Sequence, residues 1–506
     1  MTRTQQFEVL DWLRAGHAWS VQPDVVETHA ALIFLVGDRA YKVKKAIDLG
    51  YLDFSTLEQR RRALERELRL NRRTAPNLYL SVRPICLGAD GDLSLSHDGE
   101  VVEWLLEMRR FPGDALLSTV ADRGVLDGDA IARLAARIAA FHEQEPVRRG
   151  YDWTTAVARI ALENTQDLRS QRDLLGKTLT DAVVEQRERL HRACTSELAA
   201  QAGDVRHCHG DLHLRNVFLD HGEPTLFDCI EFNDFYALIP PLYDLAFLLM
   251  DLEARRLPQL ANLALNGWWL ARDPARWNDL MRSLRLLPLY LSLRAEISAK
   301  TMARVSATLQ RACDYLSLAQ NFRFGSPRLT AIGGLSGTGK SSLGRAIAFD
   351  IGVRPGAVHL RSDQIRKRLE GVGETERLPP SAYTATASDR VYDRMFALAA
   401  LALAAGHSVI LDAVFAREAE RDQAEKIAKD AGADFAGLWL EAPTETLAHR
   451  LDMRRGDASD ADAHVLRKQL GYDLGNITWT KIDAGHSGDQ VSRVVRRHLS
   501  LSEVSR

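Results

Sequence analysis

The segment at residues 329–341, LTAIGGLSGTGKS, constrains the fold of this chain more than any other. Its apolar start predicts a strand, and a helix is predicted to begin near Ser341, so the GxxxxGK[ST] pattern lies in a strand–loop–helix context. Glycines in such a loop let backbone N–H groups wrap around phosphates, and the helix N-terminus adds the positive end of its dipole. Strand and helix patterns alternate from Leu329 onward, which predicts an α/β domain with a parallel sheet flanked by helices.

The residues predicted to hold a nucleotide phosphate are those of this loop: Gly334, Ser336, Gly337, Thr338, Gly339, Lys340, Ser341 and Ser342. We expect the Lys340 ammonium to reach the terminal phosphates as a catalytic group, and the Ser341 hydroxyl to bind Mg²⁺. Residues 407–412, HSVILD, read as a strand that ends in Asp412, a second predicted Mg²⁺ ligand. Asp363, which follows a strand in VHLRSDQIRKRL, is the predicted catalytic base. The alternative for both carboxylates is a helix cap.

A basic helix end runs into a polar loop at residues 448–462, AHRLDMRRGDASDAD. Its Arg450, Arg454 and Arg455 predict a lid over the transferred phosphate, with Arg454 as a nucleotide contact. A solvated basic face is the alternative.

Residues 328 to about 480 resemble the P-loop kinases related to gluconate kinase, zeta toxin and the 5′-polynucleotide kinases. The resemblance rests on GLSGTGKS, RSDQIR and VILDAVF. It implies transfer of the γ-phosphoryl group of ATP to a hydroxyl, with Asp363 as the base and Arg366 as a contact for a substrate phosphate. Members of these families differ in substrate, so the acceptor does not carry over.

A second motif, HGDLHLRN, occupies residues 209–216, and Asp228 follows in TLFDCIEF. Phosphoryl transfer needs a carboxylate near the acceptor hydroxyl, and oxygen ligands for Mg²⁺. Asp211, Asn216 and Asp228 supply that set. Short apolar runs after Asn216 and before Asp228 predict a hairpin that brings the three residues to one cleft.

This pattern resembles the aminoglycoside phosphotransferase and choline kinase family, whose catalytic loop reads HGDxxxxN. The resemblance implies a bilobal, protein-kinase-like α+β domain at the N-terminal end of the chain. It also implies that Asp211 is the catalytic base, that Asn216 and Asp228 hold Mg²⁺, and that His209 orients the loop. Asp244, in the later YDLAFLL, is expected to be structural.

A kinase of this type also needs a buried lysine, and Ala40-Tyr41-Lys42 predicts Lys42 for that position on a strand. Lys44 shares the same face and is the alternative. The partner carboxylate is expected on the next helix, which is predicted to begin at Ser55. Glu67 is preferred to Glu65 there because it lies nearer the apolar stripe.

No GxGxxG precedes Lys42, so only the turn near Thr28 is left to cover phosphates. The same predicted helix carries a crowd of arginines, which predicts a solvated face or, as the alternative, a surface for a phosphorylated substrate or nucleic acid. These arginines are Arg60, Arg61, Arg62, Arg66, Arg69, Arg72 and Arg73.

The length of 506 residues is too great for one core, and the turn-forming NFRFGSPR at residues 321–328 predicts a boundary. We expect a kinase domain over 1–322 and a P-loop kinase domain over 328–506. The 66 basic and 68 acidic residues nearly cancel, so the whole chain has no field that favours nucleic acid. The five cysteines form no CxxC pair, no secretion signal begins the chain, and no apolar run approaches the ~20 residues of a membrane span, which predicts a cytoplasmic protein.

Three functions follow from these observations. The first is a bifunctional enzyme that uses ATP and Mg²⁺ to phosphorylate hydroxyl groups of a small molecule at two sites. The second is one active P-loop kinase, for a small molecule or a nucleic-acid 5′-hydroxyl, with a regulatory or substrate-binding N-terminal domain. The third is a nucleotide-switched interaction module, which Asp363 disfavours because a switch needs no acceptor base. The sequence determines neither the acceptor nor the oligomeric state.

Overall fold

The computed structural model describes residues 3–48, 50, 52–96, 98–304, 306–453 and 458–501. The chain divides into two compact units. The first unit comprises residues 1–137, 144–151 and 203–244, and the second comprises 138–143, 152–202 and 245–506. The predicted boundary falls within the second unit, between the end of helix α14 at Asn321 and the start of strand β11 at Arg328. The division into domains 1–322 and 328–506 therefore stays a prediction.

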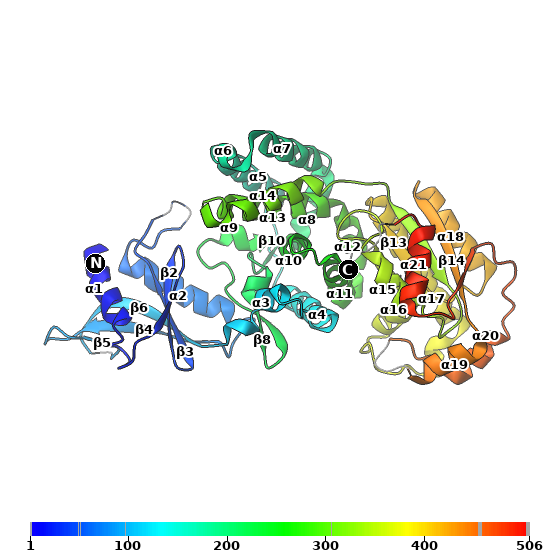
Figure 1. Cartoon of the computed structure of the whole chain (residues 1–506), viewed down its shortest axis with the longest axis horizontal. Helices are drawn as coiled ribbons and strands as arrows, with labels where there is room; N and C mark the ends of the chain where they lie inside the picture. The colour runs from blue at the N-terminus through cyan, green and yellow to red at the C-terminus, as the bar shows by residue number, and fades with distance from the viewer. Residues whose placement is uncertain are drawn as a thin grey trace. The chain divides into compact units, whose positions relative to one another are not determined.

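The first unit contains an antiparallel sheet of six strands in the order β1-β2-β3-β6-β4-β5. Helix α2 packs along strands β4 and β6, as Figure 1 shows. The apolar faces of this sheet are buried, with Phe34, Val43, Ile85 and Leu105 in one cluster. The elements are α1 (Arg3–Arg14), β1 (Asp24–Glu27), β2 (Ala31–Val36), β3 (Arg39–Lys44), α2 (Leu57–Asn71), β4 (Tyr79–Leu87), β5 (Leu93–Ser94) and β6 (Glu100–Arg109).

The helix predicted near Ser55 forms at the expected place, and a hairpin precedes it. Strands β2 and β3 pair through a turn at Gly37 and Asp38. The cap of α2 is Thr56 rather than Ser55, because the Thr56 hydroxyl accepts from the N–H of Gln59 while the Gln59 side chain returns to the Thr56 backbone. These two reciprocal hydrogen bonds satisfy the backbone N–H groups of Thr56 and Gln59. A Ser55 hydroxyl alone would not satisfy both.

The rest of the first unit is built from short elements around the 209–216 motif. Strands β8 and β9 form the predicted antiparallel hairpin, and β7 pairs with β10. The elements are α3 (Leu117–Asp122), the larger part of α4 (Gly128–Gln144), β7 (Arg206–His207), β8 (Val217–Asp220), β9 (Glu223–Leu226), α9 (Asp234–Ala237), β10 (Leu238–Ile239) and the start of α10 (Pro241–Ala254).

The second unit begins with helices, most of whose apolar faces pack against one another. Helix α13 is buried on nearly every side, as expected for a helix at the centre of a bundle. The helices are α5 (Trp153–Ser170), α6 (Arg172–Leu175), α7 (Lys177–Arg192), α8 (Thr195–Gln201), α11 (Pro258–Ala271), α12 (Trp277–Ser283), α13 (Leu287–Met302) and α14 (Leu309–Asn321).

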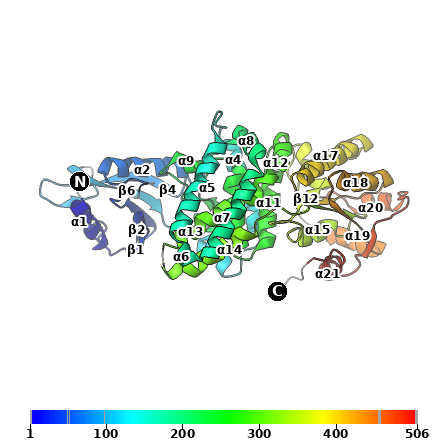
Figure 2. The same ribbon diagram turned by 90° about the horizontal axis from the view of Figure 1, so that it is seen from above.

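The same unit continues into a five-stranded, wholly parallel sheet in the order β12-β13-β11-β14-β15. Figure 2 shows helices α15 and α21 on one face and α17 and α18 on the other. The elements are β11 (Arg328–Gly333), α15 (Lys340–Ala348), β12 (Val358–Arg361), α16 (Ser362–Leu369), α17 (Ala385–Ala404), β13 (Val409–Asp412), α18 (Glu418–Asp430), β14 (Asp434–Glu441), α19 (Thr444–Met453), α20 (Ala463–Leu470), β15 (Thr480–Asp483) and α21 (Gly488–His498). The predicted fold class is confirmed: a kinase-like α+β part and a helix-flanked parallel sheet.

Candidate functional site

The 209–216 loop of the first unit holds two predicted site residues together. The Nδ2 of Asn216 donates to the Oδ2 of Asp211 at 2.8 Å and to its backbone oxygen at 2.9 Å. Because the amide nitrogen is used in this way, the Oδ1 of Asn216 is the atom suited to a metal ion. Asp228 follows β9 in a left-handed conformation, with φ of 58°, and its N–H donates to the hydroxyl of Tyr79.

Lys42 connects Asp228 to helix α2. Its Nζ donates to the Oε1 of Glu67 at 2.6 Å and to the Oδ1 of Asp228 at 2.9 Å. Glu65 instead contacts Arg61 at the surface. The structure thus brings together Lys42, Glu67 and Asp228, as the preferred assignments require, although their roles stay predictions.

Lys44, the alternative lysine, lies in the same network. Its Nζ is 2.7 Å from the Oε2 of Glu67 and 2.5 Å from the Oε1 of Glu231. Glu67 is therefore shared by two buried lysines. Glu231 is not among the residues predicted from the sequence, where its only signal is that it follows Asp228 by three residues.

The charges of this network shift the pKa of each member. Burial would lower the pKa of Lys42, but the carboxylates of Asp228 and Glu67 raise it well above its usual value. Burial would raise the pKa of Asp228, yet Lys42 holds it below the usual value. Burial raises the pKa of Glu231 despite the nearby Lys44. The lysines are charged at neutral pH, and Asp228 is ionised and suited to binding a cation.

Two buried side chains fix the backbone of the loop. The Asp244 carboxylate accepts from the N–H groups of His209 and Gly210 at 3.0 and 2.8 Å. The Nε2 of His209 donates to the carbonyl oxygen of Phe227 at 2.9 Å, and its Nδ1 accepts from the N–H of Asp211. Burial lowers the pKa of His209, so the ring is neutral, as this pattern of one donor and one acceptor requires. These contacts are those of a loop-orienting histidine and a structural aspartate.

The arginines of α2 are largely paired within the chain. Arg60 is buried against Glu103, while Arg61 and Arg62 both contact Glu58. These pairings weaken the case for a phosphate-binding surface on this helix.

The phosphate loop of the second unit is shaped by glycines. Gly334, Gly337 and Gly339 have φ of 138°, 86° and 90°. A Cβ at Gly337 would lie 2.8 Å from the backbone oxygen of Leu447, so both the conformation and the space there favour glycine. The Nζ of Lys340 donates to the carbonyl oxygens of Gly334 and Leu335 at 2.8 and 3.0 Å.

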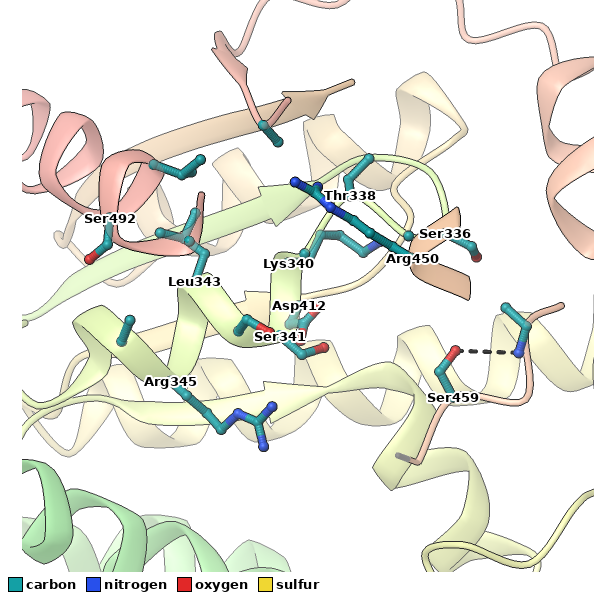
Figure 3. Close-up of a pocket in the computed structure, with 18 of the residues that line it drawn as sticks. Ser336, Thr338, Lys340, Ser341, Leu343, Arg345, Asp412, Arg450, Ser459 and Ser492 are labelled. Atoms are coloured by element: carbon teal, nitrogen blue, oxygen red, sulfur yellow. Dashed lines mark hydrogen bonds between the residues drawn. The ribbon is translucent and has the colours of Figure 1, made fainter. Parts of the chain in front are cut away.

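A cavity of about 1480 Å³ opens at this loop. Figure 3 shows the labelled side chains of Lys340, Ser341 and Asp412 around the loop, and Arg450 near Thr338. Of the predicted residues, the described lining of the cavity includes Ser336, Gly337, Thr338, Gly339, Lys340, Ser341, Ser342, Asp363 and Asp412 but not Gly334. The hydroxyl and carboxylate oxygens of this set are hard donors that fit Mg²⁺.

Asp412 ends strand β13 as predicted, and two side chains from β12 face its Oδ2. The Nε2 of His359 is 3.3 Å away and the Nε of Arg361 is 3.5 Å away. Burial alone would raise the pKa of Asp412, but contact with His359 and the charge of Arg361 hold it well below the usual value. The carboxylate is therefore ionised throughout the physiological range.

Asp363 is the second residue of α16 and lines the cavity. Burial raises the pKa of its carboxyl, an effect that a hydrogen bond from Ser459 opposes. A raised pKa favours proton acceptance at neutral pH.

The predicted arginine contacts have mixed outcomes. Arg366 is buried, donates to the carbonyl oxygen of Ala382 and lies over the ring of Tyr383, so its guanidinium serves the local fold. Arg450 lines the cavity and donates to the backbone oxygen of His486. Arg454 and Arg455 lie outside the described residues.

No helix among the described parts of the chain has the length and apolar character to cross a membrane.

Two stretches of the chain match known protein families. Residues 51–280 match the family described as "Phosphotransferase enzyme family", and residues 329–472 match the one described as "AAA domain". Over 478 residues the chain is 31% identical to the uncharacterized protein Rv2004c of Mycobacterium tuberculosis, covering 90% of this chain and 91% of that protein. The chain belongs to the Rv2004c family. Mb2027c of Mycobacterium bovis, another member, gives the same identity and coverage.

Solved structures similar to parts of this member of the Rv2004c family include two that cover 63% of the chain. One is a choline/ethanolamine kinase family protein from Mesorhizobium loti, 14% identical with a TM-score of 0.37 over 94% of its chain. The other is the GDP and kanamycin complex of APH(2")-IIia, 16% identical with a TM-score of 0.40 over 99% of its chain. The Mycobacterium tuberculosis APS kinase CysC, in complex with AMPPNP and APS, is 20% identical with a TM-score of 0.25, over 35% of this chain and 98% of its own.

Both halves therefore carry kinase or phosphotransferase domains, and the predicted resemblances are confirmed. The protein is an ATP-dependent kinase that acts on hydroxyl groups, the enzyme class expected from the two motifs.

Proposed function

We propose that the chain is a bifunctional phosphotransferase with one working site in each compact unit, each transferring the γ-phosphoryl group of ATP to a hydroxyl of a small molecule. The observation that carries the proposal is that each unit gathers a lysine and carboxylates around one place. Lys42, Glu67 and Asp228 meet in the first unit. Lys340, Asp363 and Asp412 line one cavity in the second.

In the first unit, Asp211 accepts the proton of the acceptor hydroxyl as its oxygen forms a bond to phosphorus. The Oδ1 of Asn216 and the carboxylate of Asp228 hold Mg²⁺, and Lys42 binds the nucleotide phosphates. ATP with Mg²⁺ supplies the electrophilic phosphorus, and the bond to the bridging oxygen breaks to release ADP. His209 and Asp244 keep the loop backbone in place during this exchange.

In the second unit, the loop N–H groups and Lys340 bind the phosphates, for which Lys340 must leave the carbonyl oxygens of Gly334 and Leu335. Ser341 and Asp412 hold Mg²⁺, and Asp363 takes the acceptor proton. The raised pKa of Asp363 suits this role because the carboxylate can accept a proton readily at neutral pH.

The test uses the full chain, ATP with Mg²⁺ and a metabolite pool, followed by mass spectrometry for products that gain one phosphate. Asp211→Asn and Lys340→Ala are compared with the unaltered protein, and exposed Asp422→Asn serves as the control. We expect each site variant to lower the formation of one product about 100-fold or more while the other product is unchanged. Bifunctionality is excluded if all products depend on Lys340 and none on Asp211.

A second candidate is a single active P-loop kinase beside a regulatory first unit. The direct bond from Lys42 to Asp228 favours it, because both groups must separate before they can bind phosphate and metal. The acceptor of that kinase can be a small molecule or a nucleic-acid 5′-hydroxyl. Phosphate transfer to a 5′-hydroxyl oligonucleotide but to no metabolite would identify the latter.

A further inference from the structure

Strand β12 lies at the edge of the parallel sheet, and helix α11 covers that edge. The Nδ2 atoms of Asn262 and Asn266 donate to the carbonyl oxygen of Ala357 at 3.0 and 3.2 Å. The N–H of His359 donates to the Oδ1 of Asn266 at 2.8 Å. An edge strand would otherwise leave these backbone groups unpaired, so two asparagine side chains act in place of a neighbouring strand.

The ring of His359 extends from this edge toward the phosphate site. It packs on helix α15 so closely that a Cβ at Gly344 would lie 2.5 Å from the Nε2 of His359. The same Nε2 is 3.3 Å from the Oδ2 of Asp412. His359 therefore lies between the helix that follows the phosphate loop and the carboxylate assigned to Mg²⁺.

Helices α16 and α17 also bond to the segment at and after the end of α11. Arg368 of α16 donates to the carbonyl oxygens of Ala271 and Arg272 at the end of α11. Arg394 of α17 donates to the side chain of Asn278 and to the carbonyl oxygen of Pro274. All of these residues belong to the second compact unit, although α11 lies in the stretch matched by the phosphotransferase family.

We propose that His359 is a positioning residue for the P-loop site and that Asn266 of helix α11 holds it in place. By contacting one oxygen of Asp412, His359 orients the carboxylate so that its other oxygen can serve the metal ion. Side chains around a metal ligand commonly affect metal affinity about 10–100-fold when they are removed. A helix outside the matched P-loop stretch thus helps to set the Mg²⁺ dependence of the P-loop reaction, an inference that rests on the proposed function of that site.

The experiment measures binding of AMP-PNP by calorimetry as Mg²⁺ is titrated. All proteins are full-length and carry Asp228→Asn, which removes a predicted metal ligand of the first site and leaves Lys42 paired with Glu67. The variants are His359→Ala, His359→Gln and Asn266→Ala. The matched controls are His407→Ala, a buried histidine that bonds the backbone oxygen of Gly356, and Asn164→Ala, a buried asparagine that bonds the backbone oxygen of Leu293.

We expect the Mg²⁺ concentration for half-maximal nucleotide binding to rise about tenfold in His359→Ala and about threefold in Asn266→Ala. His359→Gln should restore most of the loss, because its amide nitrogen can occupy the position of Nε2. Nucleotide binding in EDTA should be unchanged, and both controls should match the parent. A merely structural role would lower the thermal midpoint of all five variants without this selective shift.

The positioning role is wrong if His359→Ala shows the same Mg²⁺ midpoint as His407→Ala. Should His359→Ala not fold, an unshifted midpoint in Asn266→Ala excludes the part of the proposal in which Asn266 of helix α11 holds His359 in place, and a midpoint for His359→Gln shifted by about tenfold excludes the part in which a donor at the position of Nε2 suffices. A parent that binds AMP-PNP with no dependence on Mg²⁺ or on Lys340 would instead overturn the proposed function of the site.

Discussion

The two candidate sites are built on opposite physical principles. In the first unit, binding groups are side chains that neutralise one another: Lys42 and Lys44 share Glu67 and also contact Asp228 and Glu231. In the second unit, the phosphate loop is shaped by backbone conformation, and Lys340 donates to the carbonyl oxygens of Gly334 and Leu335. The first site depends on matched charges, whereas the second depends on glycines.

Because of this difference, the loss of a lysine should affect the stability of the fold differently at the two sites. Removing one partner of a buried ion pair leaves an uncompensated charge in a medium of low polarity, which is costly. Removing a lysine that contacts carbonyl oxygens leaves groups that water can solvate in the open cavity. The two lysines should therefore differ in what their loss does to the fold.

The largest expected effect comes from exchanging each lysine for methionine. Lys42→Met should lower the free energy of unfolding by about 3–5 kcal/mol, because the buried carboxylate of Glu67 loses one of its two ammonium partners and Asp228 loses its own. Lys340→Met should change it by less than about 1 kcal/mol while abolishing turnover at the P-loop site. Urea unfolding followed by circular dichroism measures both. Equal destabilisation by the two substitutions would contradict the contrast between the sites.

Buried carboxylates provide the second comparison. Glu67 has two lysines within 2.7 Å, whereas Glu253 has Arg354 at 3.8 Å. Burial raises the pKa of Glu253 to about 7, against a weaker opposing effect of Arg354. The folded state thus holds this proton more tightly than the unfolded state, and the associated stability is lost as pH rises from about 4.5 through 7.

Glu253→Gln should therefore gain stability over the unaltered protein as pH increases. We expect the difference in unfolding free energy between the two proteins to grow by about 2–3 kcal/mol from pH 5 to pH 8. Paired urea titrations at both pH values measure it, with exposed Glu185→Gln as the control. A difference that does not change with pH would show that Glu253 is ionised at little cost in the fold.

Much of this contrast was predictable from the sequence, since both motifs have fixed spacing within short segments. Lys42, Asp211, Asn216 and Asp228 lie near one another because a hairpin and a strand bring them there, and the phosphate loop is contiguous. The contact from Lys42 to Asp228 joins residues 186 positions apart, and it was the family resemblance rather than spacing that placed Lys42 at this site. No resemblance pointed to Glu231 as a partner of Lys44, which lies 187 positions away.

The surroundings of Asp412 were missed for a related reason. Arg361 faces Asp412 because the parallel register pairs these two residues across β12 and β13, and His359 shares their face two residues earlier. Register between distant strands is set by the whole sheet, so a single segment does not contain it. The hydrogen bond between Asn266 and the N–H of His359 likewise joins residues far apart in the sequence, and so does the contact of Arg366 with Ala382.

The loops themselves give a third comparison. Asp244→Asn should destabilise the first unit by about 2 kcal/mol, because an amide oxygen replaces a carboxylate that accepts from two loop N–H groups. It should lower turnover at the first site and leave the P-loop site unchanged. Gly337→Ala should lower turnover at the P-loop site and leave the first site unchanged. An alanine at φ of 86° is strained, and its Cβ would contact the Leu447 backbone. Product-resolved assays of both variants test this, and a loss of both activities in either variant would argue against independent loops.

The smallest expected effect distinguishes the two lysines of the first site. Lys42 and Lys44 are both buried and both contact Glu67, so Lys44→Met should also destabilise the unit. Of these two lysines, Lys42 is the one that contacts the predicted metal ligand Asp228. Lys42→Met should therefore raise the KM for ATP at the first site about tenfold more than Lys44→Met does, which corresponds to about 1.4 kcal/mol. Steady-state kinetics at low temperature, where both variants remain folded, measures the ratio. If Lys44→Met raises the KM as much as Lys42→Met does, nucleotide binding relies on the whole charge network, and the paired side chains of the first site act as one unit.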